Sequence, residues 1–355
     1  MTLPTHIASL YETMTQEAAY DGRPAKLFTL RNASGMTATF MDIGATWLSC
    51  TLPVDNTDRE VLLSYATMPQ HLMQTAYFGA TVGRYANRIA NGRFVIDGGE
   101  HKVEANQGEH TLHGGPDGFD KRRWTVQEQT DTVIVFGLVS ADGDQGFPGE
   151  LKATVRFELT DANALDIQYV AECDKACPVN FTNHAYFNLM GDTTGEDCLA
   201  HRLSISADQF VPTDANGIPT GELKSVEGTG FDFREIKTLK QDFLTDEEQK
   251  LALGYDHAFL LNTSVTDGKA VAVRAVSPDN RVELEVKTTK PAVQLYTGNY
   301  LAGEPARHGE QVKHQGFCLE TEFLPDAPNH PEWPGDSILK PGEQYQHQTI
   351  YQFTF

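Results

Sequence analysis

Two neighbouring segments of this chain alternate apolar and polar residues without interruption, and a period of two excludes an amphipathic helix. The segments are LKATVRFELT (151–160) and ALDIQYVAEC (164–173), and the turn sequence TDAN (160–163) links them. Because successive side chains of a strand point to opposite faces, each segment has one apolar and one polar face. The pattern predicts an antiparallel hairpin with one face in water, and RVELEVKTT (281–289) repeats it.

The rest of the chain is also rich in strand patterns and poor in helix signals. DTVIVFGLVS (131–140) is apolar on both faces, so we expect it inside a sheet that is packed on both sides. Thr245 followed by Glu248 predicts a helix start with a capping box, and a short turn after Thr67 is a second candidate. No linker or repeat interrupts the strands, which continue to the final YQFTF. We therefore predict an all-β fold, a large antiparallel β-sandwich with few short helices, as a single domain over residues 1–355.

The charge of the chain limits its partners. The 355 residues carry a net charge of −21, which repels phosphate backbones and anionic lipid. We therefore expect no nucleic-acid partner and no membrane partner. The first residues contain no basic region followed by an apolar run, so we expect no signal peptide. Five cysteines, an odd number, indicate reduced thiols and a cytoplasmic location, and Cys173 and Cys177 lack the second pair that a zinc site needs.

Five segments contain more polar and turn residues than a sheet requires. None of them is a dinucleotide-binding fingerprint, a P-loop or a nucleophile elbow. His110 and His113 have a spacing that would suit a metal on a helix, but HTLHGG continues into glycine and proline and is not helical. We therefore expect no metal. The segments are GRYANRIANG (83–92), HTLHGGPDGFDKRRW (110–124), TNHAYFNL (182–189), YDHAF (255–259) and GFCLETEFLPDAPNHPEWPGD (316–336).

TNHAYFNL (182–189) carries a polar but uncharged face if it is a strand. Thr182, His184, Tyr186 and Asn188 then point one way, and the apolar residues mostly point the other way. Free histidine has a pKa near about 6.5, which suits a group that gives and takes a proton near neutrality. A single strand histidine is more often structural, so this face alone does not identify a site.

GFCLETEF (316–323) places two acids on one strand face. Glu320 and Glu322 share that face with Cys318, and their positions are about 7 Å apart. If both were removed from water, at least one would have a raised pKa; the alternative is that both are solvated surface charges. Asp256 lies on an apolar strand face and needs a partner there.

Arg88 has the chemistry to bind a carboxylate or neighbouring sugar hydroxyls, although a surface ion pair is the commoner role for an arginine. A histidine, a glutamate and an arginine together provide an acid, a base and a positioning group. The residues by themselves do not name a substrate.

Seven segments occur in the order found in the aldose 1-epimerase family, and they span nearly the whole chain. The sequence therefore resembles that family, and is most similar to its bacterial galactose mutarotases. The resemblance implies a large antiparallel β-sandwich that interconverts the α and β anomers of free aldoses without a cofactor. The segments are GRYANRIANGRF (83–94), LHGGPDGFDKRRW (112–124), DGDQGFPG (142–149), NHAYFNL (183–189), YDHAFLL (255–261), ETEFLPDAPNHPEWP (320–334) and KPGEQY (340–345).

The resemblance also implies roles for individual residues. Glu320 is similar to the family's general base at the C1 hydroxyl, and His184 to the general acid at the ring oxygen. His113 resembles the residue that supports the ring oxygen and C1. Arg88 and Asp256 resemble residues that bind sugar hydroxyls, and Asn87 belongs to the same NR pair as Arg88. The implied substrate is a monosaccharide, galactose and also glucose, and the protein is expected to be a monomer or homodimer.

Two positions depart from the common family pattern. Glu322 stands where many members have glutamine, and it would raise the pKa of Glu320 or bind a hydroxyl if it faced the site. His110 stands where asparagine is frequent, and we favour a tolerated surface change over a sugar contact.

Three other functions remain open from the sequence. One is an epimerase of hexose 6-phosphates, although Arg122 and Arg123 form no dedicated phosphate cluster. Another is a sugar-binding protein without catalysis, which would not need both His184 and Glu320. The third is a glycosidase, which two acids on one strand face fit poorly.

Overall fold

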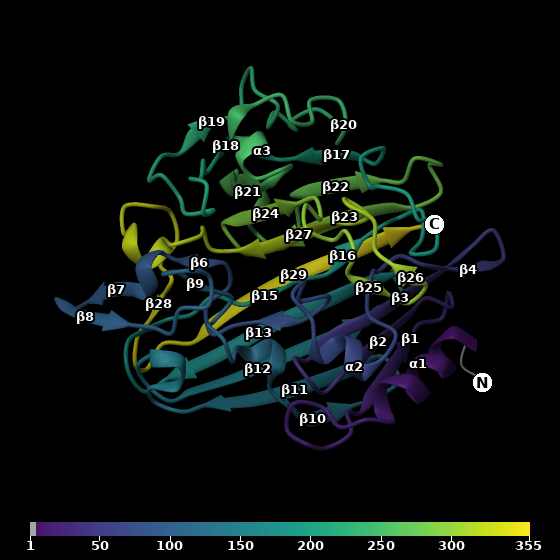
Figure 1. Ribbon diagram of the computed structural model, residues 1–355, viewed down its shortest axis with the longest axis horizontal. Helices are drawn as coiled ribbons and strands as arrows, with labels where there is room; N and C mark the ends of the chain where they lie inside the picture. The colour runs from purple at the N-terminus through teal and green to yellow at the C-terminus, as the bar shows by residue number, and fades with distance from the viewer. Residues whose placement is uncertain (1–4) are drawn as a thin grey trace.

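The computed structural model describes residues 5–355, and strands are its main regular secondary structure (Figure 1). Every pair of named strands in these residues is antiparallel. Three sheets have four or more strands, and five small two-stranded ladders accompany them. The prediction of a mostly antiparallel β-sandwich with few short helices is therefore confirmed.

The largest sheet has nine strands and contains both predicted alternating segments. Its order is β10-β11-β12-β13-β29-β23-β22-β17-β20. The strands are β10 (Thr125–Gln129), β11 (Val133–Ser140), β12 (Leu151–Leu159), β13 (Ala164–Cys173), β29 (Tyr345–Thr354), β23 (Glu283–Thr288), β22 (Val273–Val276), β17 (Arg202–Ile205) and β20 (Lys237–Thr238). The hairpin β12–β13 is the one predicted, and β29, the long yellow strand in Figure 1, lies between β13 and β23.

Two further sheets complete the layers. The six-stranded sheet has the order β16-β27-β24-β21-β18-β19, and the four-stranded sheet has the order β1-β2-β3-β4. The six are β16 (Tyr186–Phe187), β27 (Phe317–Glu322), β24 (Ala292–Tyr296), β21 (Asp256–Leu261), β18 (Ala207–Phe210) and β19 (Lys224–Ser225). The four are β1 (Leu27–Arg31), β2 (Thr37–Met41), β3 (Thr46–Val54) and β4 (Thr57–Glu60).

Short elements connect and flank the sheets. The ladders pair β14 (Cys177–Pro178) with β28 (Ile338–Leu339), β15 (Thr182–Asn183) with β5 (Thr81–Val82), β25 (Pro305–Ala306) with β26 (Gly309–Glu310), β6 (Arg88–Ile89) with β9 (Thr111–Leu112), and β7 (Arg93–Ile96) with β8 (Gly99–Lys102). The α-helices in the described residues are α1 (Thr5–Thr15), α2 (Met68–Leu72) and α3 (Glu247–Leu251). Single 3-10 turns cover Ala90–Gly92, Phe119–Lys121, Asp144–Gly146, Thr263–Val265 and Ala327–Asn329.

Aromatic side chains fill the space between the nine-stranded sheet and the two smaller sheets. Phe40 of β2 packs on Phe157 of β12 with ring centroids 4.4 Å apart. Tyr351 of β29 contacts Trp47 of β3 at 5.8 Å and Phe187 of β16 at 5.4 Å. These rings belong to one buried apolar cluster, which extends along the chain from Phe28 to Phe353. Both smaller sheets are thereby fixed against the same face of the large sheet.

Two of the local predictions were wrong. The stretch 131–140 is not packed on both sides along its whole length, because Phe136 is in the core whereas Val139 is 61% exposed on the outer face of the sheet. Isolated apolar residues on a wet face are common, so an apolar run does not require two packed faces. The capping box at Thr245 is absent, since the α3 N-cap is Asp246 and the Thr245 hydroxyl donates to the carbonyl of Asp242 instead.

The predictions for Thr67 and for the cysteines were confirmed, whereas helix α1 was not predicted. Thr67 caps α2 and forms a capping box with Gln70. All five cysteines are buried and unpaired. The strand patterns gave no signal for α1, where Leu10 and Met14 pack into a small apolar cluster of their own. Within residues 5–355 the helices are all too short or too polar to cross a bilayer.

Candidate active site

The register of the six-stranded sheet assembles one wall of a pocket from four strands. Tyr186 of β16 lies opposite Cys318 of β27, which lies opposite Tyr296 of β24, which in turn lies opposite Asp256 of β21. Two residues further along β27, Glu320 lies opposite Gln294. Because alternate residues share a face, this row and the next point the same way. The pocket has a volume of about 250 Å³.

The opposite wall comes from the segments around β6 and β9, which a glycine holds together. Gly114 has a φ of +89°, and a Cβ at this position would lie 2.0 Å from the carbonyl oxygen of Gly83. Only glycine allows the two backbones to approach so closely. As a result His113 and Asn87 pair: the His113 N–H donates to the Asn87 carbonyl at 3.0 Å, and the Asn87 N–H donates to His113 Nδ1 at 3.1 Å.

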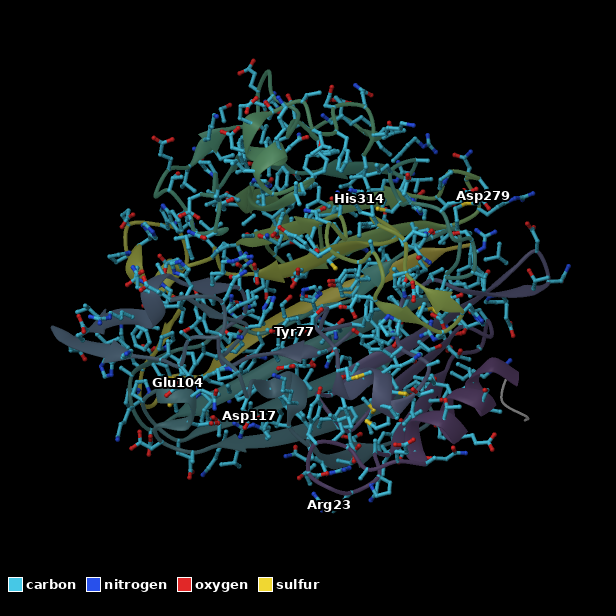
Figure 2. All side chains as sticks on the ribbon, viewed as in Figure 1. Arg23, Tyr77, Glu104, Asp117, Asp279 and His314 are labelled. Atoms are coloured by element: carbon cyan, nitrogen blue, oxygen red, sulfur yellow. The ribbon has the colours of Figure 1, made fainter. Side chains whose placement is uncertain are left out.

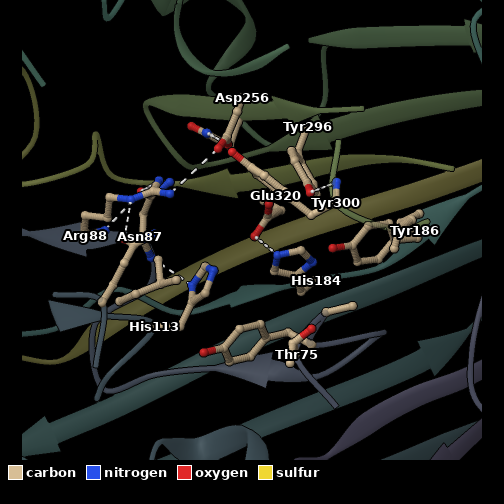
Figure 3. A pocket seen from close by; sticks show the side chains of 16 residues that line it. Thr75, Asn87, Arg88, His113, His184, Tyr186, Asp256, Tyr296, Tyr300 and Glu320 are labelled. Carbon is tan, nitrogen blue, oxygen red and sulfur yellow. Dashed lines mark hydrogen bonds and ion pairs between the residues drawn. The ribbon is translucent and has the colours of Figure 1, made fainter. Parts of the chain in front are cut away.

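His184 and Glu320 meet at the centre of the pocket (Figure 3). His184 Nε2 lies 3.5 Å from Glu320 Oε2, and the two side chains are almost fully buried. The imidazole lies between the rings of Tyr77 and Tyr186, at centroid distances of 5.9 and 5.0 Å and nearly parallel to both. On its other side Nδ1 lies 3.6 Å from Cys318 Sγ. These contacts fix the ring with Nε2 directed at the carboxyl group.

Arg88 and Asp256 lie together at the other end of the pocket (Figure 3). Arg88 Nη2 is 3.7 Å from Asp256 Oδ2, and Gln294 Nε2 donates to Asp256 Oδ1 at 2.7 Å. Arg88 Nε also donates to Gln107 Oε1 at 2.8 Å. Both charged groups keep part of their surface open to the pocket. Asp256 therefore has the partner that its apolar strand face required, and the pair still offers donors and acceptors to a ligand.

Burial shifts the pKa values of His184 and Glu320 in opposite directions. Removal from water disfavours imidazolium and lowers the pKa of His184 to about 4. Burial, and then the neighbouring Glu322 and Asp256, raise the pKa of Glu320 well above its ordinary value. The two shifts favour a neutral imidazole beside a protonated carboxyl over an imidazolium–carboxylate ion pair, so between the two pKa values the pair carries one proton.

His113 is fixed in one tautomer. Its Nδ1 accepts the Asn87 N–H, and burial lowers the pKa of His113 well below its ordinary value, so the ring is neutral near pH 7. A neutral imidazole whose Nδ1 accepts a hydrogen bond carries its proton on Nε2. His113 thus presents a hydrogen-bond donor to the pocket.

The tautomer of His113 disfavours metal binding in the pocket. One ligand atom from each of His113, His184 and Glu320 lies within 4.8 Å of the others. A metal needs an unprotonated nitrogen, whereas Asn87 already occupies Nδ1 of His113 and leaves the proton on Nε2. We therefore assign this cluster no metal-binding role.

All six predicted site residues lie in or beside one pocket. His184, Glu320, His113, Arg88, Asp256 and Asn87 line it. Glu322 and His110, the two positions that depart from the common family pattern, do not line this pocket. Glu322 is buried behind Asn87, whose Nδ2 donates to Glu322 Oε1 at 2.8 Å. His110 lines an adjoining hollow that shares Arg88 and Gln107 with the pocket, and it accepts the Asn91 N–H.

TNHAYFNL is not one continuous strand. Thr182–Asn183 forms β15 and Tyr186–Phe187 forms β16, and His184 lies between them. The predicted alternation nevertheless holds in the second half, because His184 and Tyr186 line the pocket while Phe187 and Leu189 are core. The break turns the chain from pairing with β5 to pairing with β27.

Several pocket residues carried no signal in the sequence. Tyr77, labelled near the middle of the molecule in Figure 2, lies edge-on to His113 at 4.7 Å and parallel to His184. Its φ of +57° is unusual for tyrosine, but nothing in the sequence around it marks a turn of this kind. The other lining residues that we missed are Thr75, Ala76, Gln107, Leu112, Gln294, Tyr296, Tyr300 and Leu301.

Comparisons with known proteins show the family of the chain. The family model described as aldose 1-epimerase matches residues 26–352. Aldose 1-epimerase of Escherichia coli (strain K12) is 52% identical over 96% of this chain and 98% of its own length. Galactose mutarotase of Bos taurus is 43% identical over 83% of this chain and 84% of its own. The crystal structure of galactose 1-epimerase from Lactobacillus acidophilus NCFM matches 96% of this chain and 97% of its own with a TM-score of 0.83 and 29% identity. The chain is therefore an isomerase that belongs to the aldose 1-epimerase family.

Proposed function

We propose that the protein interconverts the α and β anomers of free hexoses, galactose and also glucose, with Glu320 as the base and His184 as the acid. The observation that carries the proposal is the approach of two buried titratable groups, His184 and Glu320, to 3.5 Å in a pocket lined by polar and aromatic side chains. A pyranose is an uncharged polyol with apolar C–H faces, and a pocket of this composition suits it. Residues 1–355 are proposed to act as one catalytic domain.

The reaction moves one proton at each end of the C1–O5 bond. In the reactive form of the pair, its one proton is on His184 and Glu320 is ionised. Glu320 then takes the proton of the C1 hydroxyl while His184 gives its proton to O5, and the C1–O5 bond breaks to leave an open-chain aldehyde. The C1–C2 bond then rotates. The O5 hydroxyl attacks the other face of the carbonyl carbon, His184 recovers the O5 proton, and Glu320 returns its proton to O1. No charge accumulates over a full cycle, because each group returns the proton that it exchanged.

The remaining polar groups are proposed to hold the sugar. The Nε2–H of His113 serves as a donor to the ring oxygen and C1 region. Arg88 and Asp256, at the far end of the pocket, are proposed to bind hydroxyls, with Asn87 beside them. Gln294 keeps Asp256 in place by its 2.7 Å hydrogen bond.

The direct test is polarimetric. Pure α-D-galactose and α-D-glucose are dissolved separately near neutral pH, and optical rotation is followed with and without the protein. We expect faster relaxation to the same end point, with the ratio of the two rates ranking the sugars. Folded protein that accelerates neither sugar would contradict the proposal, and glucose 6-phosphate would then be the next substrate to try.

Replacing Arg88 by alanine is expected to weaken sugar binding. A hydrogen bond from a charged group contributes about 1.5–3 kcal/mol, so we expect KM to rise about 10-fold to 100-fold with a smaller change in kcat. Initial rates over a range of galactose concentrations measure both constants. Arg93→Ala is the matched control, because Arg93 is exposed on β7 and pairs with Glu100 away from the pocket. A large fall in kcat at unchanged KM would show that Arg88 acts on the chemical step.

The activity is expected to persist at acid pH. Activity requires one proton on the His184–Glu320 pair. A second proton leaves no base, and it binds only as pH falls through the lowered pKa of His184, about 4. Loss of the first proton leaves no acid, and the raised pKa of Glu320 delays that loss. We therefore expect kcat/KM to be nearly constant from about pH 5 to 7, whereas control by an unperturbed histidine would give a fall centred near about pH 6.5.

A further inference from the structure

Glu322 is a buried carboxyl next to the proposed base that the reaction as described does not use. It follows Glu320 by two residues on β27 and points the same way, but it is fully buried beside Ala292 of the neighbouring strand. A carboxyl group in such a place is costly unless it has partners or stays protonated.

A hydrogen bond joins Glu322 to Asn87, and through Asn87 it is connected to two further pocket residues. Glu322 Oε1 accepts from Asn87 Nδ2 at 2.8 Å, while Oε2 has no hydrogen-bond partner in residues 5–355. Asn87 in turn donates its N–H to His113 Nδ1 and accepts the Arg88 N–H on Oδ1 at 3.0 Å. The Glu322 carboxyl therefore anchors the residue that sets the tautomer of His113 and the position of Arg88.

The positive groups near Glu322 do little to stabilise a negative charge on its carboxyl group. The titratable groups around it are Glu320, Asp256, Arg88, Lys290, Tyr85 and Tyr345. Lys290 lies over the rings of Phe323 and Tyr345 at 4.5 and 4.6 Å, and its burial lowers the pKa of its own ammonium group. Burial raises the pKa of Glu322 to about 8. Glu322 therefore gains its charge only on the alkaline side of neutrality.

We propose that Glu322 is a positioning residue for the acid–base pair: it anchors Asn87 and, once ionised, it keeps the one proton of the His184–Glu320 pair bound up to a higher pH. This inference rests on the proposed mutarotase function. A negative charge about 7 Å from Glu320 disfavours a second negative charge there, so the pair loses its proton at a higher pH than it otherwise would.

The test compares the pH profiles of kcat/KM for galactose in wild type and Glu322→Gln between about pH 4 and 10. Glutamine keeps an oxygen for Asn87 but cannot ionise. We expect the alkaline limb of the variant to move to lower pH by about one to two units, because the neighbouring charge is gone. Glu285→Gln, which changes a partly exposed acid on β23, is the matched control and should keep the wild-type profile.

Two results would overturn the inference. One is an alkaline limb at the wild-type pH in folded Glu322→Gln; a lower plateau with an unmoved limb would mean that Glu322 acts only as an anchor. If the variant does not fold, ¹³C NMR of glutamate carboxyls in the wild type replaces it, and at least two carboxyls should titrate above about pH 6. Fewer than two would also overturn the inference. Wild-type protein that leaves galactose and glucose unaffected would instead contradict the proposed function itself.

Discussion

Glu320→Gln is expected to lower kcat by about 10²-fold to 10⁴-fold, the usual contribution of a positioned general base. Glutamine has nearly the same shape, and it leaves Arg88, Asp256 and His113 in place for the sugar. It cannot take the proton of the C1 hydroxyl, so the loss should be in kcat with KM little changed. Polarimetry with saturating galactose at pH 7 measures the effect.

The control for this variant is Glu285→Gln, the same chemical change on β23 of the nine-stranded sheet. It should have wild-type kcat and KM. A Glu320→Gln protein with near-normal kcat would refute the assignment of Glu320 as the base. Removal of a buried carboxyl that has one oxygen without a hydrogen-bond partner is not expected to unfold the chain, and thermal melting would verify this.

His184→Asn is expected to reduce kcat by a similar factor, because the ring oxygen then leaves without a proton donor. The substitution also removes the group whose pKa of about 4 sets the acid limb, so the remaining activity should lose that limb. Measurement of kcat/KM across the acid range separates the two effects. The smaller asparagine opens space between Tyr77 and Tyr186, so some loss of stability is expected as well.

His101→Asn is the matched control for His184→Asn. His101 lies on β8, away from the pocket, where it stacks on Phe94. This variant should keep the wild-type pH profile. If His184→Asn is folded and shows an unchanged acid limb, His184 is not the acid of the proposed mechanism.

The strand content of the fold followed from local sequence patterns. The hairpin β12–β13 was predictable because each strand has one face in the core and one in water, which makes the alternation regular. β11 was predicted as a strand, but its outer face was not, since an apolar residue such as Val139 is tolerated in water. Helix α1 was not predicted from the sequence.

The site residues were predictable to different degrees. Glu320 and His184 could be named because they lie in long motifs that resemble a known family. Tyr77, Gln294 and Tyr296 could not, because each is an ordinary residue whose position in the pocket depends on register or on an unusual turn.

The β-sandwich class, the family and the residue types available for acid–base chemistry were predictable from the chain alone, since periodicity and motifs are local properties. Which of those residues meet depends on how the strands pair in the folded protein. His184 and Glu320 are far apart in the sequence, and pairing of β16 with β27 brings them to 3.5 Å. Burial in that pairing then shifts the pKa of each group, because desolvation depends on everything packed around it.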